Sequence, residues 1–189
     1  MIFASNNKGK LREIKKIFEE YEIKSLVEAG VHVDVVEDQD SFYGNALKKA
    51  KEIYSLTGEA VIADDSGLCI LDLNGWPGVL THRFMGEDAT DEVRNTAIIE
   101  RTNACPTRRA AVVCNLVYYD GEMILVGEGI LNGSISTSRR GENGFGFDDI
   151  FELESGKTLA ELTSEEKNEV SARALAAVDL KKKLVKKLY

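Results

Sequence analysis

The sequence predicts a mixed α/β fold, and three observations predict it. Short apolar runs typical of buried strands alternate along the chain with segments whose apolar residues recur at helical spacing. With 43% apolar residues and only 2 prolines, the chain is neither disordered nor collagen-like. Its 189 residues suffice for one domain, or for two lobes that share a core, with roughly 70% of the unfolded surface buried. We therefore expect a single two-lobed α/β domain over residues 1–189, with a groove between the lobes.

The elements of the first part of the chain follow from apolar runs and their boundaries. Apolar residues recur at helical spacing from Leu11 to Tyr21, so residues 5–10 (SNNKGK) form a loop between an N-terminal strand and a helix. Ser41 is placed to N-cap a second helix, which Gly58 ends. Short apolar runs predict strands at residues 1–5, 23–27, 31–36, 60–63 and 68–73.

The second part of the chain adds a helix, a hairpin and a long terminal helix. Thr90 begins a third helix, since the next two residues are acidic and suit a helix N-terminus. Asp120-Gly121 is the strongest hairpin signal in the sequence. Thr163 and Glu166 form a capping box, from which we expect one continuous helix to the C-terminus. The strands of the hairpin are expected at residues 109–119 and 123–131.

The charge balance limits the partners of the protein. Lys and Arg number 24 against 32 Asp and Glu, and the net charge of −8 argues against broad binding to nucleic acid or to an anionic membrane, which need a cationic face. The longest apolar run has about half of the ~20 residues that a membrane span needs, and the N-terminus lacks the apolar stretch of a signal peptide. The 3 cysteines show no paired spacing, and Cys69 and Cys114, which lie in strand-like apolar runs, are expected to be buried, reduced thiols. We expect a cytoplasmic protein.

The loop SNNKGK is a candidate phosphate site. It leads into a helix N-terminus, where backbone N–H groups together with Lys8 and Lys10 suit phosphate oxygens. The P-loop pattern GxxxxGK[ST] is absent, and Asn, Gly and Lys are also ordinary turn residues. A phosphate site and a plain turn both remain open from these residues alone.

Two adjacent carboxylates, Asp64 and Asp65, follow an apolar strand and form a candidate metal site. Carboxylates in such a place are costly unless they are solvated, hydrogen-bonded or bound to a cation. Side chains alternate across a strand, so we expect only one of the two to point into the site. Carboxylate oxygens suit Mg²⁺, and Glu37 or Asp38 can supply a further ligand. The alternative is a turn that simply caps the strand.

The segment 144–148 (GFGFD) and two cations near the C-terminus complete the candidate residues. Glycines around an aromatic residue allow close backbone approach, and Phe145 or Phe147 can stack on a flat ring; the alternative is a hydrophobic plug. Lys167 and Arg173 are six residues apart, which places them about 240° apart on one helix, as is typical of surface charges. Together the candidate segments indicate a metal-bound, phosphorylated ligand with an aromatic ring, that is, a nucleotide.

Six segments recur together, in this order, in a known family. They are residues 5–10 (SNNKGK), 41–42 with 45–46 and 49–50, 63–68 (ADDSGL), 75–79 (GWPGV), 144–148 (GFGFD) with 150–151, and 160–163 with 166–167 and 171. On these segments the chain resembles the inosine triphosphate pyrophosphatase family, also called XTP/dITP diphosphatases, over essentially its whole length.

The resemblance implies a structure and an activity. The structure is a two-lobed α/β fold with a long curved mixed β-sheet flanked by helices, the active site in the groove between the lobes, usually as a homodimer. The activity is Mg²⁺-dependent hydrolysis of ITP, dITP and XTP to the monophosphate and pyrophosphate, which cleanses the nucleotide pool. Two alternatives are a nucleotide pyrophosphatase with another base preference and a catalytically silent nucleotide-binding protein.

The resemblance also implies residue roles. Asp65 corresponds to the proton acceptor and Mg²⁺ ligand, and Glu37 to its companion ligand. The phosphate-side contacts correspond to Ser5, Asn6, Asn7, Lys8, Gly9, Lys10, Lys49 and Ser66. The base pocket corresponds to Phe145, Gly146, Phe147, Asp148, Lys167 and Arg173.

Four positions depart from the family pattern. Ala172 stands where the family usually has His, His82 where it usually has a small residue, Gly44 where it frequently has Glu, and Asp149 where it frequently has Pro. From these residues alone, His82 can be a substitute for the missing base-pocket donor or an ordinary loop histidine. These departures bear on base discrimination more than on catalysis.

Overall fold

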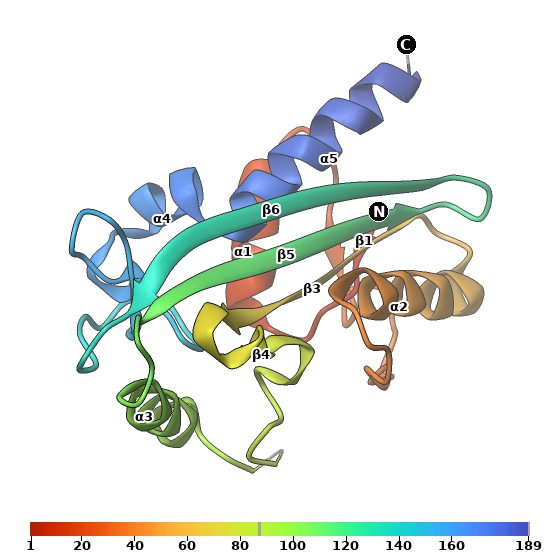
Figure 1. The fold of residues 1–189 in the computed structure, drawn as a ribbon. Coiled ribbons are helices and arrows are strands. Elements are labelled where there is room, and N and C mark those ends of the chain that lie inside the picture. Colours follow the sequence, from red (N-terminus) through yellow and green to blue (C-terminus); the bar gives the residue numbers. More distant parts are fainter. Residues whose placement is uncertain (87, 189) are drawn as a thin grey trace. The chain divides into compact units, whose positions relative to one another are not determined.

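The computed structural model describes residues 1–86 and 88–188, which form a mixed α/β fold (Figure 1). Within these ranges the sheet has seven strands in the order β2-β1-β3-β5-β6-β7, with β4 paired to β3. β1 pairs in parallel with β2 and β3, whereas β4 and β7 pair antiparallel with β3 and β6. The predicted fold class is confirmed. The strands are β1 Ile2–Phe3, β2 Lys24–Ser25, β3 Val61–Ile70, β4 Trp76–Pro77, β5 Arg109–Tyr119, β6 Ile124–Ile135 and β7 Phe151–Glu152.

Three of the helices begin where their capping residues predict. Ser41, Thr90 and Thr163 each accept a hydrogen bond from a backbone N–H of the first turn, and Gly58 ends the second helix in the left-handed region. None of the helices within the described ranges is long and apolar enough to cross a membrane. The helices are α1 Lys8–Ile17, α2 Phe42–Thr57, α3 Asp91–Thr102, α4 Ser164–Val170 and α5 Ala172–Leu188.

The chain forms two compact units. Unit 1 comprises Met1–Ser66, Cys114–Gly129 and the segment from Ala172 onwards, and unit 2 comprises Gly67–Val113 and Ile130–Ser171. Strands β3, β5 and β6 each contribute residues to both units.

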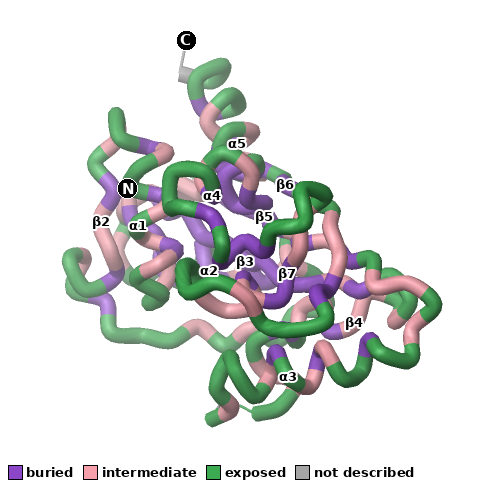
Figure 2. The backbone as a smooth tube through the Cα atoms, turned by 90° about the vertical axis from the view of Figure 1, so that its left-hand side faces the viewer, coloured by how far each residue is buried: buried purple, intermediate pink, exposed green. Residues whose placement is uncertain are grey.

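The core of unit 1 lies between α2 and the sheet. Ala46, Ala50 and Ile53 form the apolar stripe of α2 and share a buried cluster with Val61 and Ala63 of β3. Buried positions concentrate along β3 and β5 (Figure 2). Because side chains alternate along a strand, position 65 faces α2 together with positions 61 and 63, and position 64 faces the opposite side.

Helix α5 lies directly against β6 (Figure 1), and a glycine permits this approach. A Cβ atom at Gly129 would lie 1.9 Å from the carbonyl oxygen of Ala172 and 2.6 Å from the backbone nitrogen of Ala176. Only a residue without a side chain lets the backbone of α5 pack so closely on the strand.

Gly129→Ala is therefore expected to destabilise unit 1. The added methyl group collides with backbone that no rotamer change can move, and overpacking of this kind costs about 1–3 kcal/mol or more. Urea unfolding measures the loss, with Ile130→Ala, a change at an exposed neighbour on β6, as the control. Equal stability of Gly129→Ala and the wild type would contradict the packing described here.

Three predicted elements differ from the structure. β3 continues through Asp64 and Asp65, where a break was expected, because buried cations pair with Asp64 and hydrogen bonds from Asn45 and the N–H of Ser66 satisfy Asp65. Residues 31–36 form no strand, since Val33 and Val36 stay 44% and 68% exposed. The long terminal helix is interrupted at Ser171, whose extended backbone separates α4 from α5.

Candidate active site

Asp65 lies in a polar cluster between β3 and α2, with 5% of its surface exposed. Its carboxylate accepts hydrogen bonds from Asn45 Nδ2 at 2.8 Å and from the backbone N–H of Ser66 at 2.9 Å. Lys49, one helical turn after Asn45, pairs with Glu37 at 2.5 Å. α2 thus directs an amide and an ammonium group from one face toward the carboxylates of Asp65 and Glu37.

The surroundings of Asp65 make it a stronger base than an ordinary carboxylate. Burial raises its pKa to about 6; Lys49 works against this increase and Glu37 adds to it. Burial acts to lower the pKa of Lys49, but Asp64, Glu37 and Asp65 together raise it. At neutral pH Asp65 is therefore ionised yet has a substantial proton affinity, as a general base requires.

Asp64 is fully buried and holds two cations. Its Oδ2 atom accepts from Lys10 Nζ at 3.0 Å and from Arg173 Nε at 3.1 Å. Arg173 also donates to Ser66 Oγ at 3.3 Å and to Glu13. Burial acts to raise the pKa of Asp64, but Lys10, Arg173 and Lys49 outweigh it and hold the pKa below its ordinary value. The neighbouring carboxylates therefore have their pKa values shifted in opposite directions.

The Asp65 cluster suits a hard divalent cation. Glu37 contributes to the raised pKa of Asp65, so the two carboxylates repel each other and a cation between them would relieve that repulsion. Across residues 1–86 and 88–188, no group of three or more His, Cys, Asp and Glu side chains is arranged to hold a metal unaided. Mg²⁺ commonly takes one or two carboxylates and completes its shell with water and substrate phosphates. The donor set fits a Mg²⁺ ion that binds together with a phosphorylated ligand.

The predicted phosphate loop is shorter than expected. α1 begins at Lys8, and the side chain of Asn7 accepts hydrogen bonds from the N–H groups of Gly9 and Lys10 at 2.9 and 3.1 Å. Ser5 Oγ accepts from the N–H of Asn7 at 3.2 Å. These N–H groups therefore already have partners, and Lys10 is turned inward to Asp64. The phosphate contacts of residues 5–10 remain a prediction.

The loop 144–148 of unit 2 is held by a buried ion pair. Asp148 Oδ2 accepts from the N–H of Phe145 at 2.8 Å and from Lys167 Nζ at 2.6 Å, and Lys167 lies over the Phe145 ring at 4.3 Å. Gly144 has φ = 80°, and a Cβ there would lie 2.2 Å from the same Asp148 oxygen. Lys167 and Arg173 are each 7% exposed, so neither is the surface charge that their spacing indicates.

Two residues of α3 also form hydrogen bonds with this loop. The N–H of Gly146 donates to Asp91 Oδ2 at 2.9 Å, and Asn95 Nδ2 donates to the Gly146 carbonyl at 2.8 Å. Asn95 also donates to Asp149 Oδ1 at 2.6 Å, and Asp149 pairs with Arg139 at 2.6 Å. Asp149, one of the departures from the family pattern, therefore links α3 to the segment after β6.

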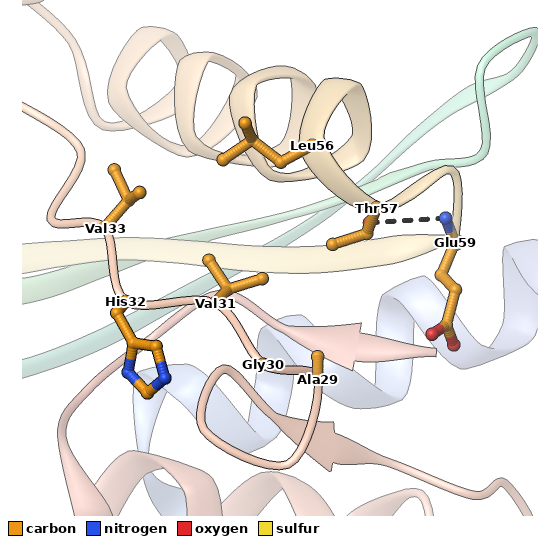
Figure 3. A pocket seen from close by; sticks show the side chains of 8 residues that line it. All are labelled: Ala29, Gly30, Val31, His32, Val33, Leu56, Thr57 and Glu59. Atoms are coloured by element: carbon orange, nitrogen blue, oxygen red, sulfur yellow. Dashed lines mark hydrogen bonds between the residues drawn. The ribbon is translucent and has the colours of Figure 1, made fainter.

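A pocket of about 470 Å³ in unit 1 lies apart from these residues. It is lined by residues 29–33 and by Leu56, Thr57 and Glu59, and Figure 3 shows Val31, Val33 and Leu56 bordering it. Glu59 pairs with Lys24 at 2.9 Å. The lining includes no predicted site residue, so the pocket is not the candidate active site.

The structure gathers the predicted residues into three groups. Asp65, Glu37 and Lys49 form the first, and Lys10, Ser66 and Arg173 meet around Asp64 in the second. Phe145, Gly146, Phe147, Asp148 and Lys167 form the third, in unit 2. Arg173 was expected among the base-pocket residues, whereas its described contacts are with Asp64, Glu13 and Ser66 in unit 1; a base contact of Arg173 remains a prediction.

Sequence reasoning missed Asn45, Glu13 and the role of Asp64. The sequence did contain a signal for Asn45 and Glu13, namely their helical spacing from predicted site residues. Asn45 precedes Lys49 by four residues and Glu13 follows Lys10 by three, spacings that place each pair on one helix face.

Comparisons with known proteins identify the family. The Ham1 family model matches residues 1–183. The chain belongs to the Ham1 family.

Relatives and a solved structure agree with this assignment. A protein of Thermoanaerobacter sp. (strain X514) named dITP/XTP pyrophosphatase is 40% identical over 193 residues, covering 100% of this chain and 98% of that protein. The dITP/XTP pyrophosphatase of Bacillus subtilis (strain 168) is 40% identical over 189 residues, covering 97% and 96%. The structure of a HAM1 protein from Coxiella burnetii superimposes with a TM-score of 0.89 at 35% identity, covering 98% of both chains. The family resemblance predicted from the sequence is confirmed.

Proposed function

We propose that this Ham1-family protein is a Mg²⁺-dependent pyrophosphohydrolase that converts dITP, XTP and ITP to the nucleoside monophosphate and pyrophosphate. The observation that carries the proposal is the pair Asp64 and Asp65, whose pKa values are shifted in opposite directions on opposite faces of β3. Because the two pKa values differ, Asp64 stays ionised whereas Asp65 can accept a proton. The names of the relatives supply the substrate class.

The predicted site residues of unit 1 then have roles in hydrolysis. Asp65 accepts a proton from the water that attacks the α-phosphorus, a new P–O bond forms, and the bond to the bridging oxygen breaks so that pyrophosphate leaves. Lys49 offsets negative charge on the phosphate oxygens. Asp65 and Glu37 would hold Mg²⁺, which would supply further charge neutralisation.

The loop of unit 2 is proposed to bind the base. Phe145 and Phe147 provide flat apolar surfaces, and the bonds of Asp148, Asp91 and Asn95 keep the loop in one conformation. A homodimer in the cytoplasm belongs to the same proposal; light scattering after size exclusion tests the dimer, and cell fractionation tests the location.

A triphosphate panel tests the proposed function. With Mg²⁺, purified protein is expected to release pyrophosphate from ITP, dITP and XTP at least about tenfold faster than from ATP, because the 6-amino group of adenine would leave a buried donor for the 6-oxo group unpaired. GTP shares the 6-oxo group and must be excluded through its 2-amino group, so the panel scores it separately. EDTA should abolish the release, and added Mg²⁺ should restore it.

Other outcomes of the panel contradict the proposal. Preferential hydrolysis of modified pyrimidine triphosphates would support the alternative base preference. Binding of ITP without turnover would support a silent nucleotide-binding protein.

A further inference from the structure

His82 is an exposed residue of unit 2 that lies against the loop 144–148. Its imidazole is nearly parallel to the Phe147 ring, with centroids 6.4 Å apart and planes inclined by 24°. Its Cε1 atom is 3.6 Å from the position that a Cβ of residue 146 would occupy, so the ring also reaches Gly146. The imidazole therefore extends the aromatic surface of this loop.

The turn that carries His82 is anchored on both sides. Thr81 is buried; its Oγ1 donates to the Gly78 carbonyl at 2.6 Å and accepts from the N–H of Leu68 at 2.9 Å. Phe84 packs edge-on against Trp76, with centroids 4.9 Å apart. His82 is thus an exposed side chain on fixed backbone, which is the arrangement that a recognition residue needs.

The hydrogen bonds described for the loop come from other side chains than His82. Asp91 and Asn95 bind both backbone polar groups of Gly146, and Lys167 holds Asp148. Burial acts to raise the pKa of Asp91, and His82 is one of the groups that lower it, so the imidazole also acts on a residue that holds the loop. Removal of the imidazole leaves the described hydrogen bonds in place, so a variant at position 82 can test a contact with a ligand.

The chemistry of imidazole adds what the phenylalanines lack. Phe145 and Phe147 stack on any base, but their rings make no conventional hydrogen bond with it. Imidazole is equally flat and carries at least one N–H in every protonation state. A donor on this surface distinguishes a purine with an exocyclic oxygen from one with an amino group in that place.

We infer that His82 is a specificity-determining residue, whose ring extends the surface that stacks on the base and whose N–H donates to an exocyclic oxygen of hypoxanthine or xanthine. This inference rests on the proposed function, because it assigns a base-recognition role within the same enzyme.

Two variants at position 82 separate the stacking role from the donor role. His82→Ala removes both, and His82→Phe keeps a flat ring without a donor. Both are expected to lower the ratio of kcat/KM for ITP to that for ATP about fivefold to tenfold, the effect of one hydrogen bond to the base. His32→Ala, at the other histidine of the chain, is the control and should leave the ratio and the rates unchanged.

A purely structural role predicts another result. If His82→Ala lowers kcat/KM for both nucleotides by one factor, or leaves both unchanged, the inference is wrong. If His82→Phe keeps the wild-type ratio of kcat/KM for ITP to that for ATP, the imidazole N–H is not the donor to the base. Should the wild type fail to hydrolyse ITP, the proposed function fails separately, and the ratio of the Kd values for IMP and AMP, measured by calorimetry on the same variants, decides the inference.

Discussion

Asp65→Asn is expected to lower kcat for ITP about 10²–10⁴-fold, the usual contribution of a general base. The amide is nearly isosteric with the carboxylate, but it has lost the proton acceptor and one proposed Mg²⁺ ligand. Pyrophosphate release at saturating nucleotide measures the loss. Asp40→Asn, a change at an exposed residue before α2, is the control that should keep full activity.

The same substitution is expected to change how stability depends on pH. The folded pKa of Asp65 is about 6 against an ordinary 3.8, so the folded state binds this proton more tightly than the unfolded state. The stabilisation from that proton is present below pH 3.8 and is lost as the pH rises through 6. The wild type loses this stabilisation between pH 4 and 7, whereas residue 65 of Asp65→Asn does not titrate. The unfolding free energy of the variant minus that of the wild type should therefore increase by about 2–3 kcal/mol over this range.

Urea unfolding without metal at several pH values measures this difference. An active Asp65→Asn variant would contradict the assignment of the base. A difference in unfolding free energy that stays constant with pH would contradict the raised pKa. The kcat/KM of the wild type, which reports the free enzyme before Mg²⁺ and nucleotide bind, should correspondingly fall about tenfold per pH unit below pH 6, as Asp65 becomes protonated.

The helices were predictable from the sequence because their signals are local. Ser41, Thr90 and Thr163 lie within a few residues of the N–H groups that they cap, so the pattern contains the whole interaction. The break at Ser171 was missed, since the capping box at Thr163 marks where a helix begins and contains nothing about its end.

The continuity of β3 was not predictable for the opposite reason. The cost of burying Asp64 depends on cations that are distant in sequence. Arg173, for example, is 109 residues from Asp64 along the chain. The family motifs predict which residues belong to the site but do not indicate which of them pair. The surface-charge interpretation of Lys167 failed in the same way, because its partner Asp148 is 19 residues away on a loop.

Asp64→Asn is expected to lower the unfolding free energy by about 3–5 kcal/mol at pH 7, the usual cost of breaking a buried ion pair from one side. Lys10 and Arg173 are 8% and 7% exposed and share Asp64 Oδ2, so the amide leaves buried positive charge without its main counterion. Glu13 still pairs with Arg173 but gains no contact that replaces Asp64. Urea unfolding at pH 7 measures the loss.

The control is Glu59→Gln, which removes a solvent-accessible ion pair with Lys24 and should cost much less than the loss of Asp64, because water screens the two charges. The folded pKa of Asp64 is depressed, so its stabilisation is present above pH 3.8 and is lost as the pH falls through the lower folded pKa. The difference between the wild type and Asp64→Asn should therefore persist down to about pH 4 and shrink only in stronger acid. If Asp64→Asn is as stable as Glu59→Gln at pH 7, the buried carboxylate does not hold Lys10 and Arg173 in place, and their positions must be set by other contacts.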